Sequence, residues 1–366
     1  MKYIDEYRDK VLVENLVREI RRETTRNWSL MEICGGQTHS IMKYNLHEIL
    51  SKEISLIHGP GCPVCVTPVE IIDAAVELGG HPNVILASFG DMMRVPGTRF
   101  DLLAARAKGG DIRIVYSPLD VLGIAEKNPE KEVVFLSVGF ETTAPAVAMA
   151  ISQASKMDLK NFSILNSLVQ VPPAIEMLIL SDYNRIEGFL AAGHVCTVMG
   201  YQEYNELAEK YKIPIVVTGF EPVDILLGIL NAVRMLEHNR YGTENAYGRS
   251  VRLEGNPAAR RLLQQIFVHT DRKWRGIGNI PGSGFSLAPD YERFDAENKF
   301  SLSHIKSAES ELCMAGDILT GRYKPSDCKA FGSACSPENP LGAPMVSSEG
   351  VCSAYYRYNR ATTVHH

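Results

Sequence analysis

The stretch VVFLSVGFETTAPAVAMAI, residues 133–151, decides the fold class of this 366-residue chain. It contains an apolar strand, then Gly-Phe-Glu, then an apolar helix, and the glycine permits a tight turn where the strand meets the helix. The same order recurs in IPIVVTGFEPVDILLGIL, residues 213–230. Two copies of one strand–turn–helix unit predict an α/β protein with two similar lobes.

Short apolar runs alternate with helical patterns across the middle of the chain, which indicates a series of βα units. Most of these runs are rich in Val, Ile and Leu without strict alternation, as expected for strands buried on both faces of a parallel sheet. Eight strands are many for one sheet, so we expect two sheets. The predicted strands are 29–33, 54–58, 83–89, 111–117, 132–138, 162–168, 185–191 and 213–219.

Glu141 and Thr142 follow the glycine turn of the first unit. One interpretation is a recurring strand–turn–helix solution, in which the glutamate simply favours the positive end of the helix dipole. The other is that both side chains line a cleft at the carboxyl ends of the strands, where open α/β sheets bind ligands. The sequence leaves both interpretations open.

Composition excludes several classes of protein. The net charge is −5, with 45% hydrophobic and 22% charged residues, which is ordinary for a globular chain with a sizeable core. The chain lacks the excess of basic residues that is typical of nucleic-acid-binding proteins. It also has no apolar run long enough to span a membrane. The opening MKYIDEYRDKVLVENLVREI is an amphipathic, charged helix without the apolar region of a signal peptide, so we expect a cytoplasmic protein.

The pattern predicts a division into segments. We expect an N-terminal helix in residues 1–27, a first α/β lobe in 28–122, a second in 123–240 and a cysteine-rich domain in 241–360. Residues 361–366 are interpreted as an appended tail. Because chain ends often meet, the N-terminal helix is expected to pack on the C-terminal domain.

The last part of the chain is rich in Cys, Gly, Pro and Ser and has little periodicity, so it needs a covalent or metal staple. Its cysteines are spaced Cys313-x14-Cys328-x6-Cys335-x16-Cys352. Four thiolates can hold zinc or a [4Fe–4S] cluster. Zinc ligands usually come in close pairs, and the absence of such a pair favours the cluster, although zinc and unligated cysteines remain open.

HGPGCPVCVTPVE, residues 58–70, carries a Cys-x-x-Cys pair, Cys62 and Cys65. Thr67 is predicted to cap the next helix, with Pro68 at its first position and Glu70 closing a capping box. A thiol close to a helix N-terminus has a lowered pKa and is more nucleophilic. The pair can therefore form a reversible disulfide, bind a soft metal, or be two inert buried thiols.

Cys34 lies at the end of another predicted strand, in MEICGGQTHSIM, before a helix expected to begin near Gln37. Helix N–H groups there favour an anion. Thr38 and His39 are candidates for orienting a ligand or moving a proton. Cys196 has no partner in sequence and is best interpreted as a small buried hydrophobe.

Taken together, these motifs resemble the HypD family of hydrogenase maturation factors. The resemblance rests on CGGQTH (34–39), GPGCPVC (59–65), GFETT (139–143) and the four C-terminal cysteines, in that order along nearly the whole chain. It implies two α/β lobes with a third, cluster-bearing domain.

The resemblance also implies a function in building the Fe(CN)2CO unit of [NiFe]-hydrogenases, together with the chaperone HypC and with cyanide delivered by HypE. Cys34 would be the thiolate that holds a transient iron carrying cyanide and carbon monoxide. Cys62 and Cys65 would be a redox-active pair. The four C-terminal cysteines would hold a [4Fe–4S] cluster that passes electrons toward them.

Two other functions are compatible with the cysteines. A thiol–disulfide oxidoreductase that uses an iron–sulfur cluster to reduce a protein partner would also need the Cys62–Cys65 pair, but it would not need a third thiolate in CGGQTH. A non-catalytic zinc protein would need only the C-terminal four.

Overall fold

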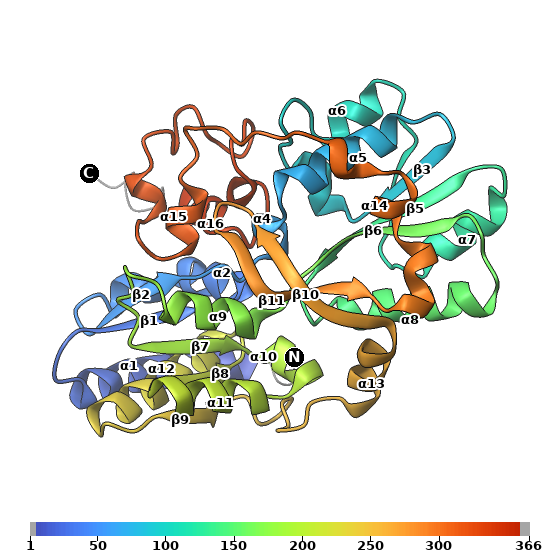
Figure 1. Ribbon diagram of the computed structural model, residues 1–366. Helices are drawn as coiled ribbons and strands as arrows, with labels where there is room; N and C mark the ends of the chain where they lie inside the picture. The colour runs from blue at the N-terminus through green and yellow to red at the C-terminus, as the bar shows by residue number, and fades with distance from the viewer. Residues whose placement is uncertain (1–4, 359–366) are drawn as a thin grey trace.

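The computed structural model describes residues 5–358 and contains two separate parallel sheets with helices on their faces (Figure 1). The predicted α/β class with two lobes is confirmed, and each of the eight predicted strands is present. None of the helices described in residues 5–358 combines the length and the hydrophobicity that a membrane-spanning segment requires. The predicted tail, 361–366, lies outside the described residues.

The first sheet has five parallel strands in the order β2-β1-β7-β8-β9. Alternate residues face opposite sides. Leu30 and Val216 pack with α12, whereas Met31 and Val217 belong to the core on the other face. The strands are β1 (Trp28–Glu32), β2 (Ile54–His58), β7 (Gly188–Ala192), β8 (Pro214–Thr218) and β9 (Gly242–Asn245). The helices of this lobe are α1 (Lys10–Glu23), α2 (Gly35–Lys43), α3 (Leu46–Ile49), α9 (Val171–Ile179), α10 (Gly193–Met199), α11 (Gln202–Tyr211) and α12 (Pro222–Glu237).

The second sheet has four parallel strands in the order β4-β3-β5-β6. Phe135 on β5 packs with α7 and α8, and its neighbour Leu136 faces the core that contains α5. The strands are β3 (Val84–Ser88), β4 (Ile112–Ile114), β5 (Glu132–Gly139) and β6 (Phe162–Leu168). The helices are α4 (Pro63–Val66), α5 (Val69–Gly80), α6 (Leu102–Ala107), α7 (Asp120–Lys127) and α8 (Ala144–Lys156).

The predicted lobe boundaries, 28–122 and 123–240, are wrong. Strand β1 pairs with β2 on one side and with β7 on the other. The chain thus leaves the first sheet after β2, builds the whole second sheet, and returns at β7. Local patterns identify buried strands but do not show which strands exchange hydrogen bonds, so a contiguous division was the simpler and incorrect prediction.

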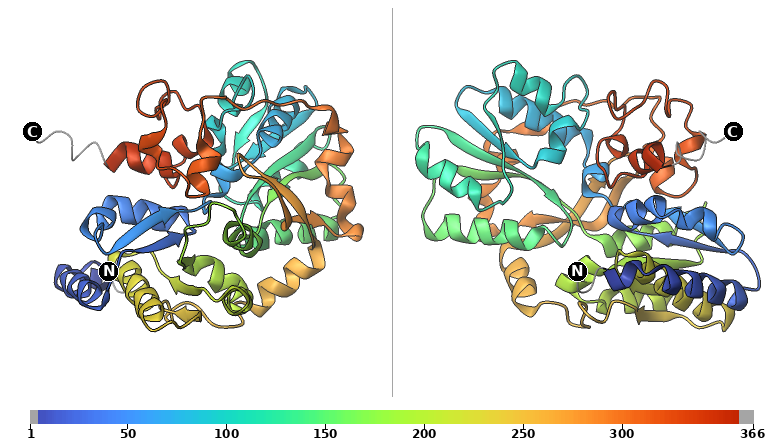
Figure 2. Two further views of the ribbon diagram at one scale, coloured as in Figure 1. Left: turned by 60° about the vertical axis from the view of Figure 1, so that its left-hand side comes forward. Right: turned by 180° about the vertical axis from the view of Figure 1, so that it is seen from behind.

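The N-terminal helix packs on α12 rather than on the C-terminal segment, which corrects the predicted contact. Val17 and Ile20 are buried in the same apolar cluster as Ile229 and Val233. Figure 2 shows α1, in dark blue, lying along α12, in yellow. The α1 sequence carries its apolar residues on one face, and α12 offers the matching apolar surface.

Residues 241–360 do not form one unit as predicted. Strand β9 belongs to the first sheet, and the antiparallel hairpin of β10 (Phe267–Trp274) and β11 (Gly278–Leu287) packs on the second lobe. The Asn166 side-chain amide on β6 donates to the Phe285 carbonyl, 2.7 Å away, and ties that hairpin down. The remaining helices are α13 (Pro257–Ile266), α14 (Ala296–Lys299), α15 (Ala315–Leu319) and α16 (Val351–Tyr358).

The cysteine segment, residues 313–358, lies beside α2 of the first lobe (Figures 1 and 2). Its helix α16 contacts α2 directly. This placement brings the end of the chain to the beginning of the first sheet, where the sequence motif CGGQTH is located.

We predict that Ile20→Ala lowers the free energy of unfolding by about 2–5 kcal/mol, because it leaves a cavity between α1 and α12. Ile20 is fully buried, at 0% exposure. The control is Val11→Ala on the same helix, where the side chain is 63% exposed and the expected change is within about 0.5 kcal/mol. Urea denaturation measures both, and equal stability of the two variants would contradict the packing of α1.

Candidate functional site

Cys34 joins strand β1 to helix α2 at the edge where neighbouring strands end. It is the N-cap of α2, in extended conformation, and its side chain is 3% exposed. The preceding run Trp28–Glu32 forms the strand, and the Gly-Gly pair that follows begins the helix at once, slightly earlier than predicted. This geometry presents the thiol beside the first N–H groups of the helix.

The His194 ring contacts the Cys34 sulfur, and sequence reasoning missed this residue. Its Nδ1 lies 3.8 Å and its Nε2 4.0 Å from Cys34 Sγ. His194 is the second residue of α10, which directly follows β7, the strand that pairs with β1. A histidine just past a buried strand, in AAGHVC, was the available signal, but nothing local to that motif shows that β7 lies next to β1.

The environment of His194 keeps its imidazole neutral. Removal of the ring from water lowers the His194 pKa to about 4. The ring packs on Phe220 at a centroid distance of 5.0 Å, and Phe220 belongs to the second Gly-Phe-Glu turn. A neutral imidazole has a free nitrogen lone pair, so His194 is able to bind a metal ion at neutral pH.

A buried carboxylate, Glu32, organises the backbone around Cys34. Its Oε2 accepts the Cys34 N–H at 2.8 Å, and its Oε1 accepts from the Thr38 hydroxyl and from His58 Nδ1, the latter at 2.7 Å. Glu32 is fully buried. Thr38, predicted to orient a ligand, therefore contacts Glu32 and positions the loop.

His39, predicted to orient a ligand or move a proton, contacts the cysteine segment. Its Nδ1 lies 3.3 Å from the Ser348 carbonyl, and its Nε2 lies 3.3 Å from the Tyr358 hydroxyl. Its ring also meets the Tyr358 ring edge-on, with centroids 5.4 Å apart. His39 thus joins α2 to the cysteine segment.

The Cys34 thiol is protonated in the absence of a metal. Burial raises its pKa well above the usual value, and the carboxylates of Glu349 and Glu32 add to the rise, whereas the N–H groups of Gln37 and Gly36 oppose it. A metal ion that binds here has to displace that proton, because the thiolate is the ligand.

Cys62 and Cys65 form a disulfide, with their Cα atoms 5.2 Å apart. Cys62 caps the short helix α4, which begins with Pro63. The predicted capping box is wrong. Thr67 donates to the Pro63 carbonyl and ends α4, Pro68 is the N-cap of α5, and Glu70 pairs with Lys273 of the hairpin instead.

The disulfide loop packs directly on the Cys34 loop. The Gly35 N–H donates to the Gly61 carbonyl at 3.0 Å. A Cβ atom at Gly61 would lie 2.1 Å from the Cys34 nitrogen, so only glycine permits this approach. The structure therefore brings together the two front cysteine motifs that the sequence treats as separate.

A cavity of about 360 Å³ opens beside Cys62. Asp91 and Arg94 of the second lobe and Glu349 of the cysteine segment contribute to its lining. Glu349 also contacts the Cys34 loop, since a Cβ atom at Gly35 would lie 2.6 Å from the Glu349 Cβ. The first lobe, the second lobe and the cysteine segment therefore meet beside this cavity.

Glu141 is buried at the end of β5, next to a small cavity of its own. It accepts the Val171 N–H at 2.8 Å, and burial raises its pKa to about 8. That cavity is also lined by Glu203 and Tyr204 and does not include Cys34. Thr142 is half-buried at the start of the turn. Cys196 is fully buried, as expected of a small hydrophobe.

The four C-terminal cysteines line one cavity, although 38 residues lie between the first of them, Cys313, and the last, Cys352. A Cβ atom at Gly342 would lie 2.4 Å from Cys313 Sγ, and the Leu341 N–H lies 3.4 Å from Cys335 Sγ as a donor. Within residues 5–358, no three side chains of His, Cys, Asp or Glu converge closely enough to hold a single metal ion.

Comparison with known proteins supports the motif resemblance. A family model described as "HypD: Hydrogenase formation hypA family" matches residues 11–359. Hydrogenase maturation factor HypD2 of Bradyrhizobium diazoefficiens is 44% identical over 370 residues, which cover 98% of this chain and 97% of the relative.

Two further relatives agree. Hydrogenase maturation factor HypD of Rhodobacter capsulatus is 44% identical over 373 residues, covering 99% of both chains. HypD of Escherichia coli is 42% identical over 373 residues, covering 98% of this chain and 99% of the relative. The chain belongs to the HypD family of hydrogenase maturation factors.

Proposed function

We propose that this protein is a redox-active scaffold on which the Fe(CN)2CO group of [NiFe]-hydrogenase is assembled. It holds an iron ion as cargo at Cys34, jointly with a HypC-type chaperone, and receives cyanide from a HypE-type partner. The observation that carries this proposal is the placement of the Cys34 sulfur 3.8 Å from His194 Nδ1, next to the Cys62–Cys65 disulfide loop.

The chemistry of Cys34 and His194 suits iron cargo. Thiolate and imidazole are ligands that iron accepts in proteins. The imidazole is neutral because its pKa is about 4, and the N–H groups at the start of α2 favour an anionic ligand such as cyanide. Glu32 holds the Cys34 backbone in place, so the thiol is presented by a rigid element.

The Cys62–Cys65 pair supplies a two-electron couple. Reduction of its disulfide takes up two electrons and two protons and gives two thiols. The close approach of Gly61 to Cys34 supports this role, because the disulfide loop then lies next to the proposed iron ligand. No other part of the described chain contains a disulfide.

The four cysteines of the C-terminal segment fit a [4Fe–4S] cluster. They line a common cavity, a glycine at 342 leaves room against Cys313, and a backbone N–H faces the Cys335 sulfur. Fe–S clusters are held by four cysteine thiolates in this way. Such a cluster would supply one-electron chemistry at the end of the molecule that contacts α2.

We expect Cys34→Ala to abolish the cyanide and carbonyl infrared bands of the purified complex with the HypC-type chaperone, because the variant lacks the iron-binding thiolate. The matched control is Cys196→Ala, which removes an equally buried cysteine outside the site and should retain the bands. Full retention of the bands by Cys34→Ala would refute the assignment and favour a thiol–disulfide oxidoreductase.

Thiol alkylation tests the proposed redox role of the Cys62–Cys65 pair. We expect two fewer alkylated thiols in the oxidised protein than after mild reduction, because Cys62 and Cys65 are linked only in the former. In Cys62→Ser this difference should vanish, since no partner remains for Cys65. If the pair stays reduced at every accessible potential, its electron role is lost.

Metal analysis tests whether the four C-terminal cysteines hold a [4Fe–4S] cluster. Anaerobically purified protein should contain about four iron and four sulfide per chain from the cluster, and Cys352→Ala should lose most of both, whereas Cys196→Ala should lose neither. Zinc in place of iron and sulfide would contradict the cluster and support the zinc alternative.

A further inference from the structure

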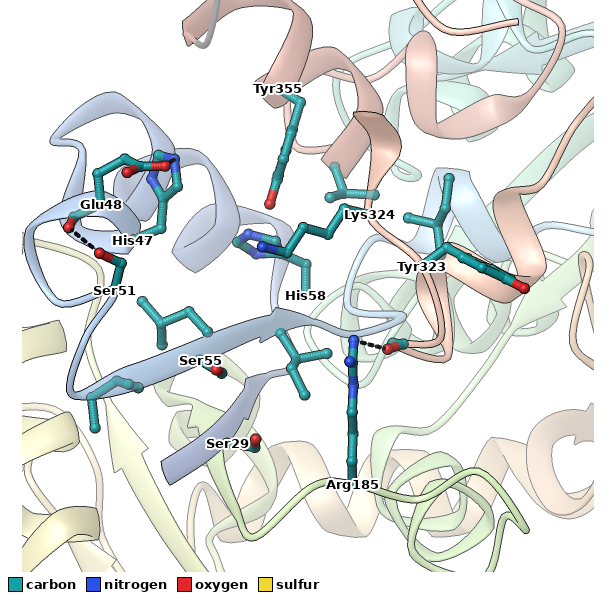
Figure 3. A pocket seen from close by; sticks show the side chains of 16 residues that line it. Ser29, His47, Glu48, Ser51, Ser55, His58, Arg185, Tyr323, Lys324 and Tyr355 are labelled. Carbon is teal, nitrogen blue, oxygen red and sulfur yellow. Dashed lines mark hydrogen bonds and ion pairs between the residues drawn. The ribbon is translucent and has the colours of Figure 1, made fainter. Parts of the chain in front are cut away.

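A second cavity, distinct from the one beside Cys62, lies between strand β2 and the cysteine segment. Its volume is about 230 Å³, somewhat below the roughly 300 Å³ at which pockets for drug-sized ligands begin. It therefore suits a small ligand. Figure 3 shows its lining. Strand β2 contributes His58 and Ser55, and the cysteine segment contributes Lys324 and, from α16, Tyr355.

His58 lines this cavity and has one buried polar atom without a partner among the described residues. The side chain is 5% exposed, and its Nδ1 is engaged by Glu32 at 2.7 Å. Because a carboxylate can only accept, Nδ1 is the donor in that bond. His58 Nε2 is buried without a hydrogen-bond partner among the described residues. A buried polar atom normally has a hydrogen-bond partner, so the lack of a partner for His58 Nε2 points to a ligand.

Two cationic side chains that line the cavity favour an anion. Lys324 and Arg185 line it, and Lys324 makes no ion pair within the described residues. Arg185 is held in place by a 2.7 Å hydrogen bond to the Gly321 carbonyl (Figure 3). The only carboxylate in the described lining is Glu48, whose Oε1 lies 3.8 Å from His47 Nε2.

The two cations argue against a metal ion at His58, despite the Glu32–His58 pair. A histidine that donates to a carboxylate is a common metal ligand, but Lys324 and Arg185 would repel a cation. They attract an oxyanion instead, since lysine and arginine are the usual side chains for phosphate recognition.

We propose that this cavity binds a small oxyanion of the phosphate class, either free phosphate or the phosphate group of a small organic ester. Lys324 and Arg185 bind its charged oxygens, and Tyr355 donates its hydroxyl. His58 Nε2 accepts from the protonated oxygen of a hydrogen phosphate. Hydrogen phosphate matches both kinds of group. Its acceptor oxygens suit the donors Lys324, Arg185 and Tyr355, and its one O–H donor suits His58 Nε2.

The site is linked to Cys34 by one side chain. Glu32 bonds His58 through Oε1 and the Cys34 N–H through Oε2. A ligand on the far side of His58 is thus separated from the Cys34 backbone by an imidazole and a carboxylate. Binding at this cavity does not depend on the proposed function, since it uses none of the cysteines.

The test is a calorimetric titration of the full-length protein with inorganic phosphate, at constant ionic strength in a phosphate-free buffer. We expect saturable binding of one phosphate per chain. Lys324→Gln should weaken that binding at least tenfold. The matched control is Lys329→Gln, an exposed lysine of the same segment that does not line the cavity, and it should bind phosphate as the unaltered protein does.

Tyr355→Phe provides a second variant that keeps the aromatic ring packed and removes only the hydroxyl, with an expected several-fold weakening. His58→Gln is less informative because it also breaks the bond to Glu32. A parallel titration with glycerol phosphate identifies the source. Tighter binding than phosphate indicates an organic ester, and weaker binding indicates the free ion. No saturable binding, or equal binding by Lys324→Gln and Lys329→Gln, would overturn the proposal.

Discussion

The buried carboxylate of Glu32 is the interaction on which the rest of the site depends. It accepts hydrogen bonds from the Cys34 backbone, from Thr38 on α2 and from His58 on β2. A carboxylate that is fully removed from water is costly unless every oxygen is engaged. The surrounding strands and helix therefore have to keep their positions, and the thiol at Cys34 is held by that requirement.

The position of Cys34 also depends on which strands are neighbours. Strand β1 lies between β2 and β7, so the residues that follow these three strands meet at one edge of the sheet. The cysteine comes from the end of β1, the disulfide loop from the end of β2, and His194 from the end of β7. Each motif is local in sequence, and the sheet order alone makes them one site.

Much of the fold was predictable from local pattern. Buried parallel strands are continuous apolar runs, and the predicted 54–58 and 162–168 match β2 and β6 to the residue. The lobe boundaries failed because pairing between β1 and β7 leaves no trace in either segment. The hairpin β10–β11 was missed since its strands, such as FVHTDRKW, are largely polar and exposed.

The candidate site was predictable to the same degree. Motif recognition identified Cys34 and the Cys62–Cys65 pair, because their glycines and prolines mark them in sequence. His39 was named because it lies near Cys34 along the chain, and in the structure its Nε2 lies 3.3 Å from the Tyr358 hydroxyl. His194 was not considered, since its motif is far from Cys34 in sequence. Thr67 satisfies every local rule for a cap, yet the preceding turn of helix α4 uses it first.

The interrupted first sheet has a consequence for synthesis of the protein on the ribosome. Strands β1 and β2 emerge early, but their partner β7 begins only at Gly188. At roughly 5–20 residues per second, this leaves the β1 edge unpaired for on the order of ten seconds. The second sheet is complete by Leu168 and is able to form first. The edge that carries Cys34 and His194 is thus completed only after the second sheet, and a nascent chain that ends before β7 lacks the partner strand that brings His194 to Cys34.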